Sequence, residues 1–187
     1  MTLPPLPTIL DRVAAYEPRF KDAGPRGFEA AVALVLAASE HGPQFVVIRR
    51  AERVGDPWSG HAALPGGKRH LEDPDLVTTA RRETMEEVGI HLGDPLGRLD
   101  DNGGRSHFGV VSTFVFTMDA PAPLTPDPSE VADAMWVPLN LLVDPSAAAR
   151  HPNRIVGPWP AWRHDDLTIW GLTHRVLTHF LSVVHHD

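Results

Sequence analysis

LPGGKRHLEDPDLVTTARRETMEEVGI, residues 64–90, is the stretch that determines how the rest of the chain is interpreted. Its second half predicts one helix, because small or apolar residues recur every four positions, at Leu76, Ala80, Thr84 and Val88. Asp73 is the expected N-cap, and Pro74 fits the first helical position, where a missing N–H has no consequence. Gly89 is expected to end the helix.

Three glutamates of this helix share one face. Glu83, Glu86 and Glu87 lie at i, i+3 and i+4, so their carboxylates converge. Such a group repels itself unless a cation lies among its members, and hard divalent ions such as Mg²⁺ take oxygen ligands of this kind. The alternative is a solvated amphipathic helix, and the three glutamates alone favour it, since glutamate-rich exposed faces are common.

Neighbouring residues shift the balance toward a metal site. Arg82 precedes Glu86 by one turn and is expected to pair with it, which leaves the other carboxylates for a metal. Gly66 and Gly67 are expected in a loop whose backbone can approach closely, so the Gly67 carbonyl is a candidate further ligand.

The same residues resemble the Nudix box, whose pattern is G-x5-E-x7-R-E-U-x-E-E-x-G-U, with U a bulky aliphatic residue. Residues 82–90 match it, except that Thr84 replaces an aliphatic residue. In the first half Asp73 stands in place of the glutamate, and eight residues instead of seven separate it from Arg82.

The inserted residue, together with an Asp at position 73, is similar to the pattern of the coenzyme A pyrophosphatase branch of this family. In that branch the sequence is roughly F-P-G-G-x-x-D-x-x-D, followed by T-A-x-R-E. Residues 79–83, Arg50-Ala51 after a strand and Ile169-Trp170-Gly171 near the last helix also resemble this branch. The departures from its pattern are Leu64 for Phe, His70 for Asp, and Gly55 where a second Arg would stand.

The resemblance implies an α/β fold of mixed α+β type, namely a Nudix α/β/α sandwich with a mixed β-sheet. The resemblance covers roughly residues 28–184. The Nudix hydrolase domain is expected at residues 28–187, with residues 1–27 as an N-terminal extension. The resemblance also implies metal-dependent hydrolysis of a nucleoside diphosphate linked to another moiety. Coenzyme A or its thioesters rank first as substrate, giving 3′,5′-ADP and 4′-phosphopantetheine, followed by nucleotide sugars, ADP-ribose and dinucleoside polyphosphates.

Residue roles follow from the resemblance. The metal, Mg²⁺ or Mn²⁺, is expected at Glu83, Glu86, Glu87 and Gly67. Catalytic roles are expected for Glu83, Arg82 and Glu130, with Glu83 the leading general base and Glu130 matching the acid that precedes a W-x-P-L strand. Asp133 is the fallback for Glu130, and a plain surface glutamate is an equal alternative. Substrate binding is expected at Arg49, Arg50, Gly66 and Gly67, whereas Arg53 is interpreted as a solvated loop residue.

The amino-acid composition limits the class of protein to which the chain can belong. The chain has 187 residues, 42% hydrophobic and 22% charged, which is ordinary for one globular domain. The formal charge is −7 without a basic run, which argues against a nucleic-acid surface. Cysteine is absent, which excludes disulfides and thiol catalysis and favours a reducing compartment. No signal peptide or membrane span is recognised, and a cytoplasmic location is expected.

The remaining elements are expected at the following places. Strands are predicted at 28–38, 44–48, 96–99, 107–118 and 130–139, helices at 9–16 and 167–184, and a short helix at 139–143. Residues 147–164 mix turn signals with tryptophans, and no element is predicted there. Dimerisation through an edge strand stays open. The competing functional class is a Nudix-like nucleotide-binding regulator, which the presence of all three box glutamates disfavours.

Overall fold

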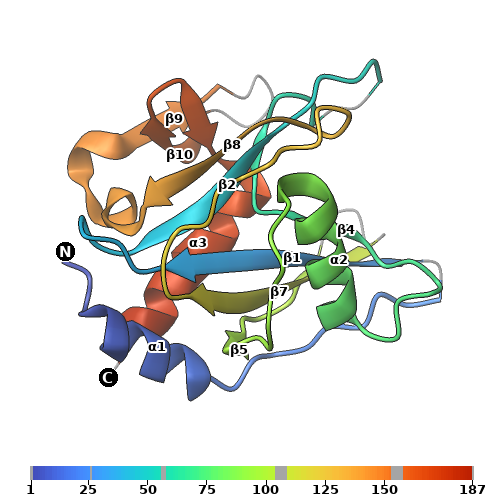
Figure 1. Cartoon of the computed structure of the whole chain (residues 1–187), viewed down its shortest axis with the longest axis horizontal. Coiled ribbons are helices and arrows are strands. Elements are labelled where there is room, and N and C mark those ends of the chain that lie inside the picture. The colour runs from blue at the N-terminus through green and yellow to red at the C-terminus, as the bar shows by residue number, and fades with distance from the viewer. Residues whose placement is uncertain (1, 26, 56–57, 104–108, 153–157, 187) are drawn as a thin grey trace.

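Two strands of ten residues, β1 (Phe28–Ala37) and β7 (Gly109–Met118), run parallel through the middle of the molecule. The computed structural model describes residues 2–25, 27–55, 58–103, 109–152 and 158–186. Strands β2 (Gln44–Arg50) and β8 (Val131–Pro138) extend the sheet in antiparallel fashion on the β1 side, and β5 (Gly97–Arg98) and β6 (Asn102–Gly103) pair with β7. The sheet is therefore mixed, as predicted (Figure 1).

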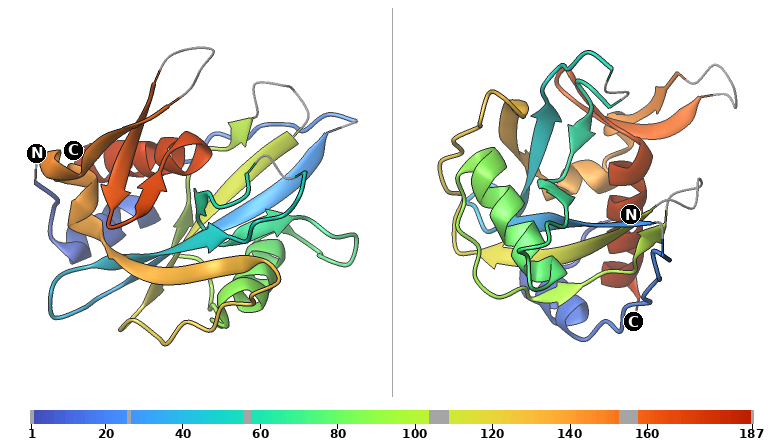
Figure 2. Two further views of the ribbon diagram at one scale, coloured as in Figure 1. Left: turned by 90° about the horizontal axis from the view of Figure 1, so that it is seen from above. Right: turned by 90° about the vertical axis from the view of Figure 1, so that its right-hand side faces the viewer.

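Helices cover both faces of this sheet. Helix α2 (Leu76–Val88) packs on the face that carries Ala31, Ala33 and Val35 of β1. Helix α3 (Gly171–His185) lies on the other face, against the side of β1 that carries Leu34 and Leu36 (Figure 2). Strand residues alternate between the two faces, so one strand serves both cores. The α/β/α sandwich expected from the sequence is confirmed.

The N-terminal helix α1 (Leu6–Ala14) belongs to the same core as α3. Its Ile9 and Val13 are fully buried beside the α3 residues Leu177 and Phe180. This helix lies within the expected N-terminal extension, so that segment contributes apolar surface to the central core.

Strands β1 and β2 separate soon after the hairpin that joins them. They pair at Leu36 with Phe45 and at Ala37 with Gln44. Further along, β3 (Ala62–Ala63) takes the free edge of β2, and β4 (Gly66–Lys68) takes the free edge of β1. The two glycines thus form part of a strand rather than the loop expected for them, and the chain crosses the gap at Leu64 and Pro65.

The C-terminal part differs most from the prediction. Two short 3₁₀ helices, η1 (Leu139–Val143) and η2 (Pro145–Ala147), lead into a separate sheet of β9 (Ala148–His151), β10 (Trp159–His164) and β11 (Leu167–Ile169). Residues 167–169, predicted as helix, are therefore strand. Helix α3 begins only at Gly171, whose φ of 64° is left-handed. The apolar spacing of residues 167–184 predicts Leu172 on the buried face of a helix, but Leu172 is exposed.

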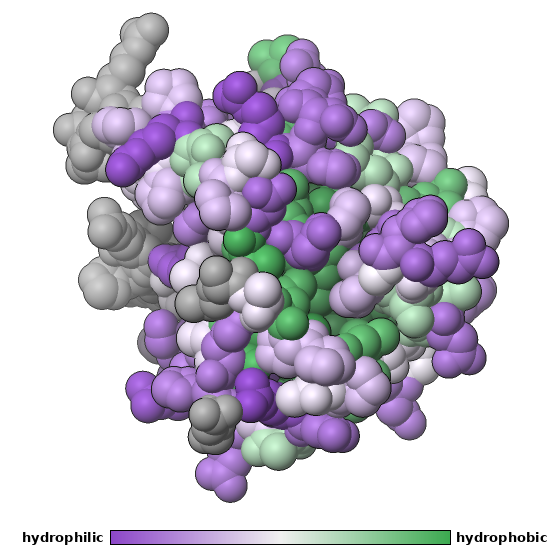
Figure 3. All heavy atoms as spheres, turned by 90° about the vertical axis from the view of Figure 1, so that its left-hand side faces the viewer, coloured by the Kyte–Doolittle hydropathy of each residue, from purple (hydrophilic) through white to green (hydrophobic). Residues whose placement is uncertain are grey.

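Polar residues cover most of the face seen in Figure 3, and apolar residues gather in a band at its centre. Among the described residues, every helix is too short or too polar to cross a bilayer.

Candidate functional site

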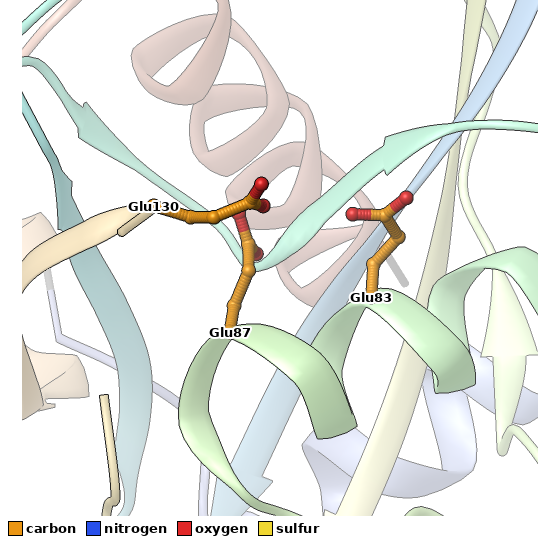
Figure 4. A group of neighbouring side chains, drawn as sticks. All are labelled: Glu83, Glu87 and Glu130. Atoms are coloured by element: carbon orange, nitrogen blue, oxygen red, sulfur yellow. The ribbon is translucent and has the colours of Figure 1, made fainter. Parts of the chain in front are cut away.

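Three carboxylates meet where α2 approaches the start of β8. Glu83 and Glu87 lie one turn apart on α2, and Glu130 directly precedes β8 (Figure 4). One oxygen from each lies within 4.8 Å of the others. Glu83 and Glu87 are buried, whereas Glu130 is exposed, so the cluster opens to solvent on the Glu130 side.

Local sequence signals orient the helix that carries two of these acids. Ala80, Thr84 and Val88 are fully buried under the sheet, which turns Glu83 and Glu87 toward β4. The helix begins after Asp75, whose carboxylate accepts a 2.7 Å hydrogen bond from the Thr78 N–H. It ends at Gly89, which adopts the expected left-handed conformation with φ of 73°.

The prediction that Asp73 is the N-cap is therefore wrong. The physical reason is that the Asp73 carboxylate pairs with Arg82 instead. Asp73 is buried and receives Nε and Nη2 of Arg82 at 3.1 and 3.0 Å. The His70 N–H and the Thr79 hydroxyl also donate to it. The Arg82 hydrogen bonds hold the pKa of Asp73 well below its usual range.

Arg82 connects Asp73 to the glutamates. Its Nη1 lies 2.8 Å from Glu83 and 2.8 Å from Glu86, and its Nη2 donates to the Lys68 carbonyl at 3.1 Å. Its pairing with Glu86 was expected. Glu86 is half-exposed and lies outside the three-carboxylate group, although the sequence placed it among the metal ligands.

Both glycines press directly against the carboxylates. The Gly66 N–H donates to Glu87 Oε2 at 2.8 Å. A Cβ on Gly67 would overlap with the Glu83 carboxylate, and one on Gly66 would overlap with the Ala31 carbonyl. Glycine at position 67 therefore lets the strand lie close to Glu83, and glycine at position 66 lets it lie close to β1.

The electrostatics of the cluster favour a cation. Burial raises the pKa of Glu87 to about 8, with Glu83 and Glu130 adding repulsion. Burial also raises the pKa of Glu83, against the opposing effect of Arg82. A divalent ion offers the missing positive charge and prefers carboxylate oxygen, so these residues fit such an ion.

The two candidate arginines lie on different faces of β2. Arg50 lies opposite Val131, a residue of the core under α2, so Arg50 is on the α2 face of β2. Arg49 follows the alternation to the other face, where Nη2 contacts Asp166 at 2.7 Å. Asp133 is the residue of β8 directly opposite Arg49 in the strand register, so it lies on the same face as Arg49 and away from the cluster. Of the other residues expected at the site, Arg82, Gly66, Gly67 and Glu130 lie against the box glutamates, and Arg50 is on their face of the sheet. Arg49 is not on that face.

Arg53 lies near the cluster, although it was interpreted from the sequence as a solvated loop residue. Arg53 Nη2 donates to the Ser129 carbonyl at 2.6 Å and lies 3.2 Å from Glu130 Oε1. The two residues are separated by 77 positions, and no local pattern reports such a contact.

Comparison with known proteins agrees with this geometry. The model of the NUDIX domain matches residues 27–159. An uncharacterised protein of Schizosaccharomyces pombe is 36% identical over 169 residues, covering 76% of this chain and 51% of that protein. The chloroplastic Nudix hydrolase 22 of Arabidopsis thaliana is 28% identical over 172 residues, covering 84% of this chain and 55% of that protein. The chain thus spans about half the length of these two relatives.

A solved structure shows the same fold. A MutT/nudix family protein from Enterococcus faecalis superposes with a TM-score of 0.56 at 16% identity. The match covers 97% of this chain and 70% of that one.

Proposed function

The chain belongs to the Nudix hydrolase family, and from this premise we propose that it hydrolyses the diphosphate of coenzyme A or its thioesters. The products are 3′,5′-ADP and 4′-phosphopantetheine. The observation that carries the hydrolytic proposal is the convergence of Glu83, Glu87 and Glu130, with one oxygen of each within 4.8 Å of the others.

Nudix hydrolases generally use divalent metal ions, and Mg²⁺ or Mn²⁺ is proposed here. A bound ion neutralises diphosphate charge and lowers the pKa of a water molecule. Glu83, Glu87 and Glu130 would hold it, with the Gly67 carbonyl as a candidate further ligand. Glu86 is proposed in a supporting role, since it pairs with Arg82 at 2.8 Å outside the cluster.

The chain's own groups supply orientation and proton transfer. Glu83 is the proposed general base, because its buried carboxylate belongs to the cluster where the ion and its water would bind. Arg82 holds Glu83 Oε1 at 2.8 Å and fixes its direction. Water oxygen joins one phosphorus, the bridging P–O bond breaks, and the water proton passes to the base.

The choice of coenzyme A rests on the residues that resemble its pyrophosphatase branch. These are the inserted residue between Asp73 and Arg82, Arg50-Ala51, and the Ile169-Trp170-Gly171 segment. Arg50 is the proposed contact for substrate phosphate, because its charge already acts at Glu87. Arg49 is less suited to that role, since it lies on the other face of β2, where its Nη2 contacts Asp166 at 2.7 Å.

Product analysis tests this function directly. Steady-state kinetics are measured on coenzyme A, ADP-ribose and diadenosine polyphosphates, with Mg²⁺, with Mn²⁺ and with excess chelator. Turnover should require the metal, and Glu87→Gln should lower kcat about a hundredfold, or ~3 kcal/mol of barrier. Full turnover in chelator refutes the metal mechanism. If coenzyme A is the poorest substrate, the branch assignment fails while the diphosphate hydrolase remains.

A further inference from the structure

Glu130 is the member of the carboxylate cluster that does not lie on α2, so other contacts must fix its direction. It is exposed, in contrast to Glu83 and Glu87. Whenever Glu83 or Glu87 is ionised, its negative charge repels the Glu130 carboxylate, and Glu130 in turn contributes to the raised pKa of each. An unrestrained side chain at this position would turn toward water.

The backbone around Glu130 is anchored on two sides. The Ala51 N–H donates to the Glu130 carbonyl at 2.8 Å, which ties it to the end of β2. The Glu130 N–H donates to the Asp127 carbonyl at 3.0 Å, and the Asp127 N–H donates to the Glu87 carbonyl at 3.2 Å. These bonds place the Glu130 backbone relative to α2, but they leave its side chain free to rotate.

Arg53 supplies the restraint on that side chain. Its Nη2 donates to Ser129 O at 2.6 Å and contacts Glu130 Oε1 at 3.2 Å, so one nitrogen joins the backbone and the carboxylate of adjacent residues. The backbone of Arg53 is itself held in place by hydrogen bonds. Ser59 Oγ accepts from the Arg53 N–H and donates to the Arg53 carbonyl, both at 2.9 Å.

The geometry points to Arg53 as a positioning residue that holds the Glu130 carboxylate toward Glu83 and Glu87 before a divalent ion binds. Arg53 acts through Glu130 and has no contact with substrate in this role. The inference rests on the proposed function only in that the cluster binds a divalent ion. It gives a function to Arg53, which was interpreted from the sequence as a solvated loop residue.

The expected effect is moderate, because both side chains are about half-exposed, at 49% and 46%. Exposed ion pairs contribute up to about a fivefold change in an equilibrium constant. Arg53→Ala should therefore weaken Mn²⁺ binding about fivefold, since the loss of a preorganised ligand outweighs the removal of one screened positive charge. It should lower kcat by a similar factor and leave KM unchanged.

The test is a double-mutant cycle measured by Mn²⁺ titration without substrate, using electron paramagnetic resonance or calorimetry. The proteins are wild type, Arg53→Ala, Glu130→Gln and the double variant. In the Glu130→Gln background, Arg53→Ala should have no further effect on Mn²⁺ affinity. Arg53→Lys should restore part of the affinity. Arg81→Ala is the matched control, because Arg81 pairs with Asp94 at 2.6 Å, outside the cluster, and should leave Mn²⁺ affinity unchanged.

An equal loss of affinity from Arg53→Ala in both backgrounds would overturn the inference. So would a raised KM with unchanged Mn²⁺ affinity, which would make Arg53 a substrate contact. Wild-type protein that fails to bind Mn²⁺ would refute the proposed function as well. Wild-type binding that Arg53→Ala does not alter would refute the positioning role alone.

Discussion

Replacing Glu87 by glutamine should stabilise the metal-free protein near neutral pH. Glu87 is 2% exposed, and burial raises its pKa from 4.5 to about 8. At pH 7 the unfolded chain carries an ionised Glu87, while the folded chain keeps it largely protonated. Folding must therefore take up a proton, which lowers stability.

The magnitude follows from the size of that shift. The penalty is absent below the unfolded pKa, grows as the pH rises above it, and levels off above the folded pKa of about 8. At pH 7 it amounts to about 3 kcal/mol, taking ~1.4 kcal/mol for each pH unit of the gap. Glutamine carries no charge and can still accept the hydrogen bond from the Gly66 N–H. Glu87→Gln should recover most of this energy.

Urea unfolding in excess chelator measures the difference. At pH 7 the variant should be more stable by about 3 kcal/mol, equivalent to a rise in Tm of roughly 6–12 °C for a chain of this size. At pH 4 the two proteins should have nearly equal stability. Added Mn²⁺ should stabilise the wild type more than the variant, because the ion favours the carboxylate over the amide.

Glu86→Gln serves as the control, since Glu86 lies outside the cluster and is half-exposed. It should change stability by less than about 0.5 kcal/mol. The reasoning is refuted if Glu87→Gln destabilises the metal-free protein at pH 7, or if its effect is the same at pH 4 and pH 7.

Three further predictions concern neighbouring residues. Asp73→Asn should lower stability at pH 7 by about 3 kcal/mol, because it breaks a buried pair with Arg82; since the pKa of Asp73 is lowered by folding, the deficit should shrink as the pH falls below about 4 in acid-unfolding curves. Arg50→Ala should reduce the preference for coenzyme A over dephospho-coenzyme A in kcat/KM, and an unchanged ratio would show that another group contacts the 3′-phosphate. Glu130→Gln should lower kcat without changing the melting curve while Asp133→Asn does little; the opposite order would place the metal-facing acid at Asp133.

The sequence predicted the central architecture because apolar patterning is a local signal. Strands β1, β2, β7 and β8 and the helix between Leu76 and Val88 were all expected near their observed positions. The start of α2 was misplaced because Asp73-Pro74 looks like a cap followed by a first helical residue. In the structure Asp73 instead forms a salt bridge with Arg82, nine residues later in the chain.

The other differences also come from contacts that no local pattern encodes. Leu167–Ile169 fits a helical apolar face, yet Leu167 and Ile169 pair in a strand with His164 and Trp162. The i, i+3, i+4 spacing correctly brings Glu83 and Glu87 together, but it cannot show that Glu86 pairs with Arg82 outside the cluster. The proximity of Arg53 to Glu130 depends on two chain segments that meet only after folding.

The hydrogen bond between Gly66 and Glu87 makes one backbone amide a spectroscopic reporter of the carboxylate cluster. Glu87 Oε2 accepts that N–H at 2.8 Å, so any change in charge or position of the carboxylate alters the electronic environment of the Gly66 nitrogen. Its amide resonance should move when Glu87 gains a proton or an ion, even with no substrate present. An NMR titration of this single glycine would follow occupancy of the cluster in the intact protein.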